Sequence, residues 1–206
     1  MKKIIYIITA VFFCMAGFVH GAEHQPLDEL KVPMEKAISI LKDPQYQKQK
    51  EAQREKIWEI VNQTFDFKAI SMRTLAKNWK LFSDKQKEEF TSVFTELLKN
   101  TYIDKIQGEF HNEEIIFTGQ DIISSTKARV NTKILREKIE IPMDYSMSLS
   151  NDKWMIYDVN IEGVSLVKNY RNQFKEILAK ETPAQLIQRL KEKNEKHEQD
   201  RIKEQD

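Results

Sequence analysis

Apolar residues recur with two different periods along this chain, and the change between them falls near Asn112. Upstream, they return three and four positions apart, for example over residues 27–41 and 90–106. That spacing is typical of one face of an amphipathic helix. Downstream, apolar and polar residues alternate, most cleanly over residues 139–149, which is the period of a strand with one buried face. The first half is therefore predicted to be helical and the second to contain a sheet.

Boundary signals divide these patterns into elements. Ser83 followed by Gln86 is a capping box and predicts the start of the longest helix, which continues to Gly108. Turn residues at 136–138 and 151–152 separate the last three strands and make them an antiparallel meander. We expect helices over 27–41, 46–61, 68–79, 83–108, 164–178 and from 182 onward, and strands over 115–117, 127–134, 139–149 and 154–161. This order predicts an α+β domain, with helices packed on one face of a curved antiparallel sheet of about four strands.

The N-terminal segment is expected to lie outside the domain. Two lysines precede an uncharged, mostly apolar run over residues 4–19, and the small residues Gly21 and Ala22 follow it. The run is somewhat short for a membrane-spanning helix, and its flanks are those of a secretory signal. We therefore predict a cleaved signal peptide over residues 1–22.

The remaining chain is predicted to form one domain with a tail. Residues 23–190 contain the periodic segments and are long enough to bury a core. After Leu190 almost no apolar residue remains, and the run KEKNEKHEQDRIKEQD over residues 191–206 is expected to be a charged, frayed or disordered tail.

Composition narrows the possible chemistry. With 33 basic and 32 acidic residues the formal net charge is +1, so we expect no attraction to nucleic acid. The one cysteine, Cys14, lies in the predicted signal peptide, and the four histidines are scattered. Thiolate sites and metal sites both need ligands at close, regular spacing. We therefore expect no metal, no cofactor and no catalytic residue.

Asp158 is the polar side chain whose position most needs an explanation. Strict alternation over residues 154–161 places Met155, Tyr157, Val159 and Ile161 on one face and Trp154, Ile156, Asp158 and Asn160 on the other. An unpaired carboxylate among large apolar side chains is costly. Asp158 is either a general base in a pocket or half of a structural ion pair with a cation such as Arg171 or Arg129, and we favour the pair with Arg171.

Methionine and tyrosine side chains collect on the same faces of the last two predicted strands. Methionine is deformable and suits ligands without a fixed shape, but such a stripe taken alone is typical of a solid core. Side chains from the long helix and from the start of the next helix are expected to close over it. The complete set of candidate lining residues is Phe94, Leu98, Tyr102, Val130, Ile141, Met143, Tyr145, Met147, Met155, Tyr157, Val164 and Leu166.

The run WMIYDVNIEGVSLVKNYRNQF, residues 154–174, resembles the signature of the MlaC-type periplasmic phospholipid-binding proteins, also called the toluene-tolerance auxiliary family. That signature has a Trp, then Tyr-Asp-Val, Glu-Gly-Val-Ser-Leu, Asn-Tyr-Arg and a Phe. Further matching pieces lie at residues 65–79, 86–102 and 183–190. Where the family often has Leu-Gly, this chain has Leu75-Ala76, and we expect alanine to keep that turn helical.

The resemblance implies a soluble, periplasmic lipid carrier with a cone-shaped, NTF2-like fold. It implies that the candidate residues hold the acyl chains of a phospholipid, with the head group near a mouth at Val164, Ser165 and Leu166. The implied partners are phospholipid, an inner-membrane ABC transporter complex and an outer-membrane lipoprotein–porin complex. Shuttling lipid between these complexes would maintain the lipid asymmetry of the outer membrane. We expect the carrier to be a monomer.

Two alternative functions stay open at this stage. One is an enzyme of the same cone-shaped class that acts on an apolar small molecule through Asp158. The other is a periplasmic chaperone that holds apolar peptide segments. Replacement of Asp158 by Asn separates the first from a carrier, and suppression of client aggregation without bound lipid identifies the second.

Overall fold

The structure is a computed structural model that describes residues 25–46 and 48–205. The predicted signal peptide lies outside the described residues. The helices are α1 (Pro26–Lys42), α2 (Lys50–Thr64), α3 (Phe67–Leu75), α4 (Asp84–Glu109), α5 (Leu166–Leu178) and α6 (Pro183–Gln205), with short 3-10 segments at Pro44–Tyr46 and Ala76–Leu81. The strands are β1 (Glu114–Ser124), β2 (Lys127–Arg136), β3 (Ile139–Ser150), β4 (Lys153–Ile161) and β5 (Val164–Ser165).

The strands form one antiparallel sheet in the order β1-β2-β3-β4-β5. The two predicted turns are present, and Glu137, Asn151 and Asp152 adopt the positive φ that tight hairpins require. Strand β1 is longer than the three residues expected. The two-residue strand β5 adds a fifth member after the turn at Gly163, whose φ is +85°. The predicted α+β class with a curved antiparallel sheet is confirmed.

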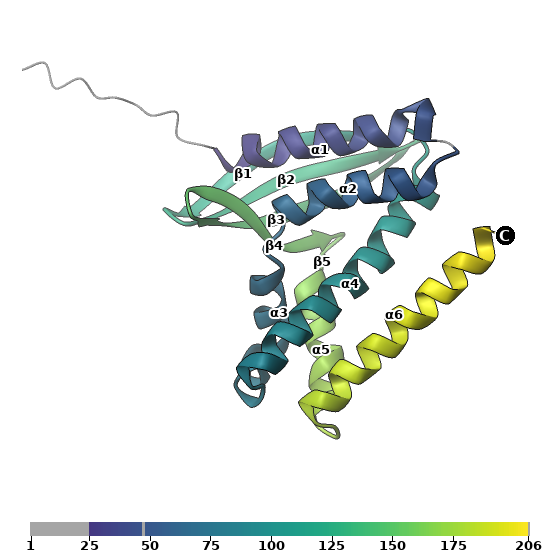
Figure 1. Cartoon of the computed structure of the whole chain (residues 1–206). Coiled ribbons are helices and arrows are strands. Elements are labelled where there is room, and N and C mark those ends of the chain that lie inside the picture. The colour runs from purple at the N-terminus through teal and green to yellow at the C-terminus, as the bar shows by residue number, and fades with distance from the viewer. Residues whose placement is uncertain (1–24, 47, 206) are drawn as a thin grey trace, which may run out of the picture.

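Helices α1 and α2 lie across one face of the sheet, while α3, α5 and α6 gather around α4 below it (Figure 1). The described residues accordingly have two apolar cores. The helical core is built on rings, and Phe94 contacts Phe90, Tyr170 and Phe174 at centroid distances of 4.9 to 5.5 Å. The second core joins Leu30 of α1 to the inner face of the sheet. Phe65, at the end of α2, packs against both cores.

The register of β4 against β3 contains a β-bulge. Ile156 pairs with Met147, and Asp158 pairs with Ser146, the residue directly before Met147 in β3. Tyr157, between Ile156 and Asp158, therefore has no partner opposite it. One extra residue on a bulged strand inverts the faces of everything that follows it.

Because of this bulge, the faces of β4 differ from those predicted. Trp154, Ile156 and Val159 all belong to the sheet core, although strict alternation separates Val159 from the other two. The prediction that Met155 and Tyr157 share a face with Val159 is wrong, because alternation does not allow for the extra residue.

The connection after α3 differs from its expected conformation. Ala76 does not keep the turn helical but adopts φ +49° and ψ −121°, and it ends α3. That region of backbone space is open to glycine and strained for residues with a Cβ. The next helix begins as predicted, because Ser83 and Gln86 form both hydrogen bonds of a capping box at the start of α4.

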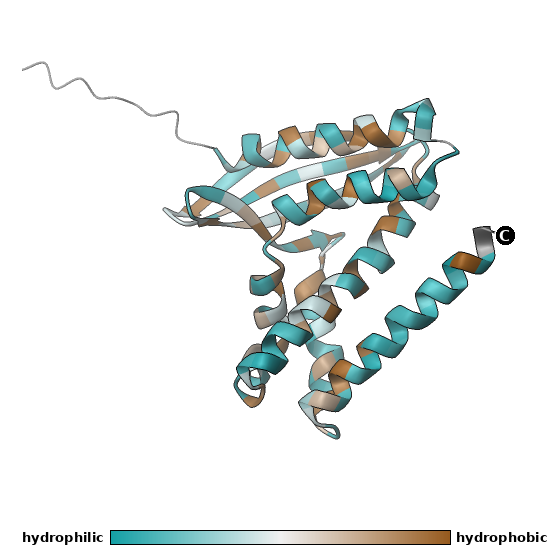
Figure 2. Ribbon diagram, viewed as in Figure 1, coloured by the Kyte–Doolittle hydropathy of each residue, from teal (hydrophilic) through white to brown (hydrophobic). Residues whose placement is uncertain are grey.

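The expectation of a frayed or disordered segment after Leu190 is corrected by α6, which continues as a helix to Gln205. Its first turns are fixed by Leu186, Ile187 and Leu190, which are at most 5% exposed in the helical core. In Figure 2 the start of α6 carries the hydrophobic colour and most of the rest of the helix the hydrophilic colour. The segment was expected to stay solvated because it lacks an apolar face, but its polar side chains bind other helices.

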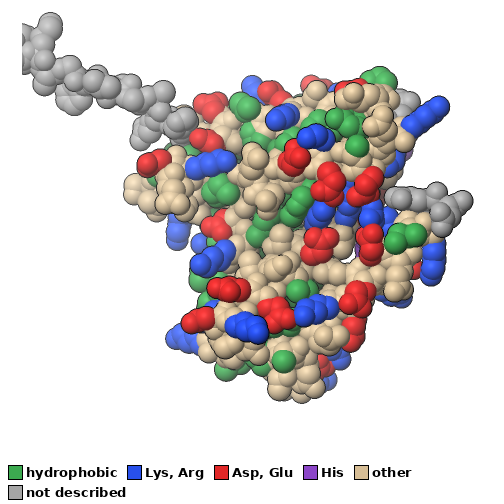
Figure 3. All heavy atoms as spheres, in the orientation of Figure 1, with side chains coloured by type: hydrophobic (Ala, Val, Ile, Leu, Met, Phe, Trp, Pro, Cys, Tyr) green, Lys and Arg blue, Asp and Glu red, His purple; other side chains and the backbone are tan. Residues whose placement is uncertain are grey.

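These polar contacts join α6 to α4 and α2, where Figure 3 shows acidic and basic side chains gathered. Lys191 donates to Glu89 at 2.6 Å, and Asn194 donates to the carbonyl of Val93 at 3.0 Å. Further along, Arg201 forms ion pairs with Glu51 of α2 and with Glu198. The distal part of α6 is therefore attached through polar side chains.

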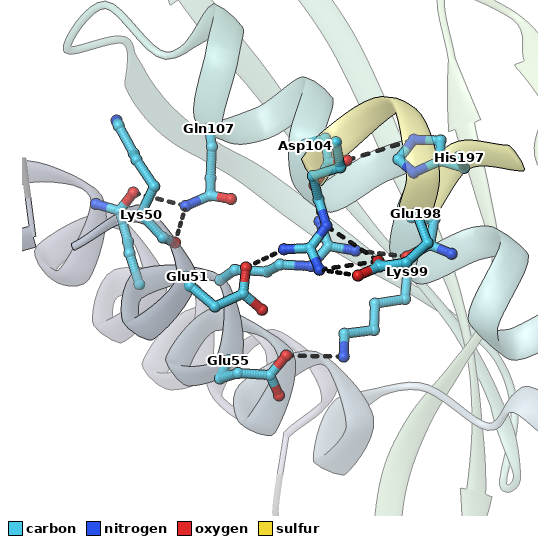
Figure 4. A network of polar contacts seen from close by, with 12 residues as sticks. Lys50, Glu51, Glu55, Lys99, Asp104, Gln107, His197 and Glu198 are labelled. Atoms are coloured by element: carbon cyan, nitrogen blue, oxygen red, sulfur yellow. Dashed lines mark hydrogen bonds and ion pairs between the residues drawn. The ribbon is translucent and has the colours of Figure 1, made fainter. Parts of the chain in front are cut away.

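A buried guanidinium lies beneath this attachment. Arg54 of α2 is 3% exposed, donates to Asn100 of α4 at 2.6 Å and pairs with Asp104. The other carboxylate oxygen of Asp104 lies 3.3 Å from Nε2 of His197 on α6 (Figure 4). Burial, followed by the nearby charge of Arg201, lowers the pKa of Arg54 from its usual value. One carboxylate thus links all three helices.

Candidate functional site

An apolar cavity of about 410 Å³ lies between α1, α2, α4 and the inner face of the sheet. Apolar side chains dominate its wall, and a few polar residues, among them Asp158, Glu113 and Arg136, also line it. The apolar lining comprises Leu30, Pro33, Met34, Ala37, Ile38 and Leu41 of α1, Ile57, Trp58, Ile60 and Val61 of α2, Phe65 after α2, Phe67 and Ile70 of α3, Leu98, Tyr102, Ile103 and Ile106 of α4, Phe110 after α4, Ile115, Ile134, Ile141, Met143, Tyr145, Ile156, Val159 and Ile161 of the sheet, and Leu166 of α5. A wall of this kind accepts a hydrocarbon ligand.

The cavity exists because α1 fills the space over the sheet at one end only. Leu30, near the start of α1, is 1% exposed and packs in the sheet core. Farther along the same face, Met34, Ile38 and Leu41 remain only partly buried, and they line the cavity. The apolar face of α1 therefore extends beyond Leu30 to side chains that border the cavity and do not pack in a solid core.

The end of α2 is fixed to the sheet and holds the opposite wall in place. The backbone N–H of Asp66 donates to the carbonyl of Ile156 at 2.8 Å, and Phe65 forms a β-bridge with the same residue. Asp66 then caps α3 by accepting a hydrogen bond from Ala69 at 2.8 Å. The chain thus turns from one cavity wall into the helical core at a point tied to β4.

The structure divides the candidate lining residues into two groups. Those that line the cavity are Leu98, Tyr102, Ile141, Met143, Tyr145 and Leu166. Those that lie elsewhere are Phe94 in the helical core, Val130 and Met147 in the sheet core, Met155 beside a shallow hollow, Tyr157 under a guanidinium, and Val164 at the surface. The second group includes Met155 and Tyr157, which the bulge in β4 separates from the face of Val159.

The lining residues of α1 and α2 were missed by sequence reasoning. Their helical periodicity was recognised, but it was interpreted as an ordinary core face. Only the partial burial of Met34, Ile38 and Leu41 distinguishes them from Leu30, and no sequence pattern reports it.

Asp158 lines the cavity and does not form the predicted ion pair with Arg171. Its Oδ2 accepts a hydrogen bond from the hydroxyl of Ser165 at 2.6 Å, and its Oδ1 accepts one from the backbone N–H of Val167 at 3.0 Å. The first turn of α5 supplies these donors, so a cation is not needed to stabilise the carboxylate.

Arg171 contributes to a different link between helix and sheet. Its Nε donates to the carbonyl of Arg73 at 2.9 Å, and the guanidinium of Arg73 lies 3.9 Å from the ring centroid of Tyr157. The bulged residue of β4 is thereby held under a cation–π contact.

A second group of polar lining residues lies where the end of α4 meets β2 and the residue before β1. Nε of Arg136 donates to Glu113 at 2.7 Å, and Nη2 donates to the backbone carbonyl of Glu109 at 3.1 Å. Burial raises the pKa of Glu113, but hydrogen bonds from His111 and Arg136 outweigh it and hold that pKa below its usual value. Both Arg136 and Glu113 line the cavity, and no pattern in the sequence indicates either residue.

Within the described residues, no group of three or more His, Cys, Asp or Glu side chains is placed to hold a metal ion. Among the helices described, none has the length and apolar character needed to cross a membrane.

The sequence and the fold are both similar to those of known proteins. The profile of the family described as MlaC protein matches residues 32–192. A phospholipid-binding protein from Ralstonia solanacearum, solved in complex with a phospholipid, superposes with a TM-score of 0.73 at 22% identity, over 84% of this chain and 98% of that chain. No curated protein matches the sequence. Because the family profile covers most of the sequence, the chain belongs to the MlaC protein family.

Proposed function

We propose that this chain is a periplasmic phospholipid carrier that holds acyl chains in the cavity between α1, α2, α4 and the sheet. The observation that carries this function is the apolar cavity of about 410 Å³ in a member of the MlaC protein family. The similar protein from Ralstonia solanacearum was solved with a phospholipid bound, which supports the same ligand class here.

Transfer of lipid by this carrier takes place while it is docked to other proteins. Each buried methylene contributes about 0.8 kcal/mol, so two acyl chains of about 16 carbons contribute roughly 25 kcal/mol in total. Release into water against that free energy is too slow to serve transport. The carrier therefore docks to an inner-membrane ABC transporter complex and to an outer-membrane lipoprotein–porin complex, and its shuttling as a monomer between them maintains outer-membrane lipid asymmetry. A signal peptide over residues 1–22 directs it to the periplasm.

The environment of Asp158 favours a carrier over an enzyme. A general base needs a carboxylate oxygen free to accept a proton from a substrate. Both oxygens of Asp158 already accept hydrogen bonds, from Ser165 and from Val167. The carboxylate therefore joins β4 to the first turn of α5, which is a structural role and needs no reaction to explain it.

The test is the lipid content of protein purified from the periplasm of expressing cells. Organic extraction followed by mass spectrometry should recover phospholipid in an amount close to one molecule per protein chain. A protein that carries no lipid but suppresses aggregation of unfolded clients would instead be a chaperone.

A pair of variants on α1 relates the lipid to the cavity. Met34→Asp places a charge on the cavity wall and should abolish co-purifying lipid. Val32→Asp, on the same helix, changes a side chain that is 67% exposed and should leave the lipid content unchanged. Equal lipid in both variants would show that the lipid binds elsewhere.

A further inference from the structure

The charged end of the cavity contains a guanidinium that is held in place but remains accessible. The side chain of Arg136 is 41% exposed, although Nε donates to Glu113 at 2.7 Å and Nη2 to the carbonyl of Glu109 at 3.1 Å. A guanidinium has five N–H donors, and no hydrogen bond joins Nη1 to any described residue. Arg136 therefore has donors left for a ligand.

The carboxylate that holds Arg136 is committed to that task. Glu113 has a side chain that is 6% exposed, and its Oε2 accepts a hydrogen bond from the backbone N–H of His111 at 2.7 Å while Oε1 accepts from Arg136. A buried carboxylate with both oxygens engaged fixes the plane of the guanidinium without competing at its free edge.

The ligand for this edge is an anion attached to an apolar tail. Arg136 lines the same cavity as Ile134, Ile141 and Ile106, so a group bound to its free donors lies directly beside the hydrocarbon wall. Planar guanidinium groups bind phosphate with paired hydrogen bonds. Beside the predicted mouth, the carboxylate of Asp158 is bonded to Ser165 and repels an anion, and the N–H of Val167 is already bonded to that carboxylate.

The remaining charges at the Arg136 end balance one another. Lys105 and Glu109, one turn apart on α4, lie 3.9 Å apart and both line the cavity. The side chain of Glu109 is 51% exposed, and its carboxylate lies 3.8 Å from Nη2 of Arg136. A cation and an exposed carboxylate side by side match a head group that carries both a phosphate and an amine.

We propose that this end of the cavity binds a zwitterionic phospholipid head group, with Arg136 donating to the phosphate and Glu109 accepting from the amine. The proposal rests on the proposed function, since it places the head group of the lipid whose acyl chains fill the cavity. It moves the head group from the predicted mouth at Val164, Ser165 and Leu166 to the polar residues around Arg136. A phosphatidylethanolamine has both charged groups, a phosphatidylglycerol only the phosphate, and a diacylglycerol neither.

The experiment loads the full chain from a detergent-solubilised equimolar mixture of those three lipids with identical acyl chains. After detergent removal and re-isolation of the protein, mass spectrometry gives the ratio of the bound lipids. The unmodified chain should take up phosphatidylethanolamine in preference to phosphatidylglycerol, and both in preference to diacylglycerol. Arg136→Gln should lower both phospholipids relative to diacylglycerol about tenfold, which corresponds to the loss of one charged hydrogen bond. Glu109→Gln should remove only the preference for phosphatidylethanolamine.

Matched variants separate these effects from changes in fold and overall charge. Arg129→Gln and Glu114→Gln alter exposed charges on β2 and β1 that do not line the cavity, and they should keep the lipid ratios of the unmodified chain. Because Arg136→Gln leaves a buried carboxylate without its partner, the double variant Glu113→Gln/Arg136→Gln is measured in parallel. It should show the same loss of phospholipid preference.

Three results would overturn the assignment. If Arg136→Gln and the double variant kept the phospholipid-to-diacylglycerol ratio, Arg136 would not bind the phosphate. If inorganic phosphate alone bound in calorimetry and depended on Arg136, while all three lipids loaded equally, the site would serve a free anion. If Glu109→Gln still preferred phosphatidylethanolamine to phosphatidylglycerol, Glu109 would not accept a hydrogen bond from the amine. Failure to load any of the three lipids is a different outcome, because it contradicts the proposed function itself.

Discussion

The hydroxyl of Ser165 donates a 2.6 Å hydrogen bond to Oδ2 of Asp158. Ser165 is also the N-cap of α5, because its oxygen accepts a hydrogen bond from the backbone N–H of Lys168 at 3.0 Å. The carboxylate takes a second donor from the first turn of the helix, the N–H of Val167. A residue of β4 thus completes the N-terminal cap of α5, where a negative charge is favourable.

Replacement of Asp158 by Asn should therefore lower stability. The amide has one acceptor where the carboxylate has two, so one donor of α5 loses its charged partner. Losing one charged hydrogen bond costs about 2 kcal/mol. For a domain of this size the melting temperature falls by roughly 2–4 °C per kcal/mol, which differential scanning calorimetry resolves.

The matched control for this change is Asp144→Asn on β3, a partly buried residue whose carboxylate has no hydrogen bond or ion pair to a described residue. It should melt within about 1 °C of the unmodified chain, because no stabilising contact is lost. The lipid recovered per folded chain should be the same in both variants. An Asp158→Asn protein of unchanged stability would contradict the capping role and reopen the possibility of a catalytic carboxylate.

Much of the fold could be predicted because its signals are local. The capping box at Ser83 and Gln86 and the turns at Glu137 and Asn151 act within a few residues, so the sequence reports them directly. The bulge at Tyr157 could not be predicted in this way. It depends on how β4 pairs with β3, and the apolar side chains around it fit either face of a strand.

The cavity was harder to predict than the fold for a related reason. Residues of one continuous segment, such as Met143 and Tyr145, could be assigned to one face by alternation. Arg136 is the last residue of β2 and Glu113 immediately precedes β1, so they meet only after the two strands pair and no spacing in the sequence indicates their contact. The attachment of α6 was missed for the same reason, since its contacts join residues about a hundred positions apart.

Ala76→Gly should stabilise the protein. Ala76 adopts φ +49° and ψ −121°, a conformation that costs a residue with a Cβ about 1–3 kcal/mol and glycine little. Glycine also gains freedom in the unfolded chain, so the net gain is about 1 kcal/mol. Chemical denaturation should show a higher midpoint at an unchanged slope.

The control for this substitution lies in the preceding helix. Ala69→Gly in α3 should destabilise by about 0.5–1 kcal/mol, because alanine there has ordinary helical angles. If both variants lost stability equally, the strain at Ala76 would be absent in solution.

Filling the cavity should block lipid binding without harm to the fold. Ala37 of α1 lines the cavity, and Ala37→Trp directs an indole into a space of about 410 Å³. The added apolar contact replaces acyl chains, so we expect lipid in the extract to fall severalfold while the melting temperature is maintained or raised. Ala52→Trp, at an exposed position of α2, should bind as much lipid as the unmodified chain. Normal lipid content in Ala37→Trp would place the acyl chains outside this cavity.

The lowered pKa of Glu113 predicts a specific dependence of stability on pH. A carboxyl group whose pKa is lower in the folded state contributes stability above its unfolded pKa, near 4.5, and loses it as the pH falls through the folded value. Glu113→Gln removes this contribution. The difference in unfolding free energy between the unmodified chain and Glu113→Gln should therefore be largest near neutral pH and shrink upon acidification. A difference that does not change between pH values of about 7 and 3 would contradict the shifted pKa.

The distal part of α6 should open more readily than its first turns. Leu186, Ile187 and Leu190 are buried in the helical core, whereas the rest of the helix is joined to α4 and α2 by contacts such as those of Lys191 and Arg201. Exposed ion pairs contribute only about 0–1 kcal/mol each, and at about 1 M salt the screening length falls to about 3 Å. Backbone amides of residues 191–205 should therefore exchange hydrogen faster than those of the first turns, and faster still in high salt. Amides of α5 around Tyr170, which packs in the same core, provide the internal control and should not respond to salt. Uniform protection along all of α6 at both salt concentrations would show that its polar contacts hold it as firmly as the apolar ones.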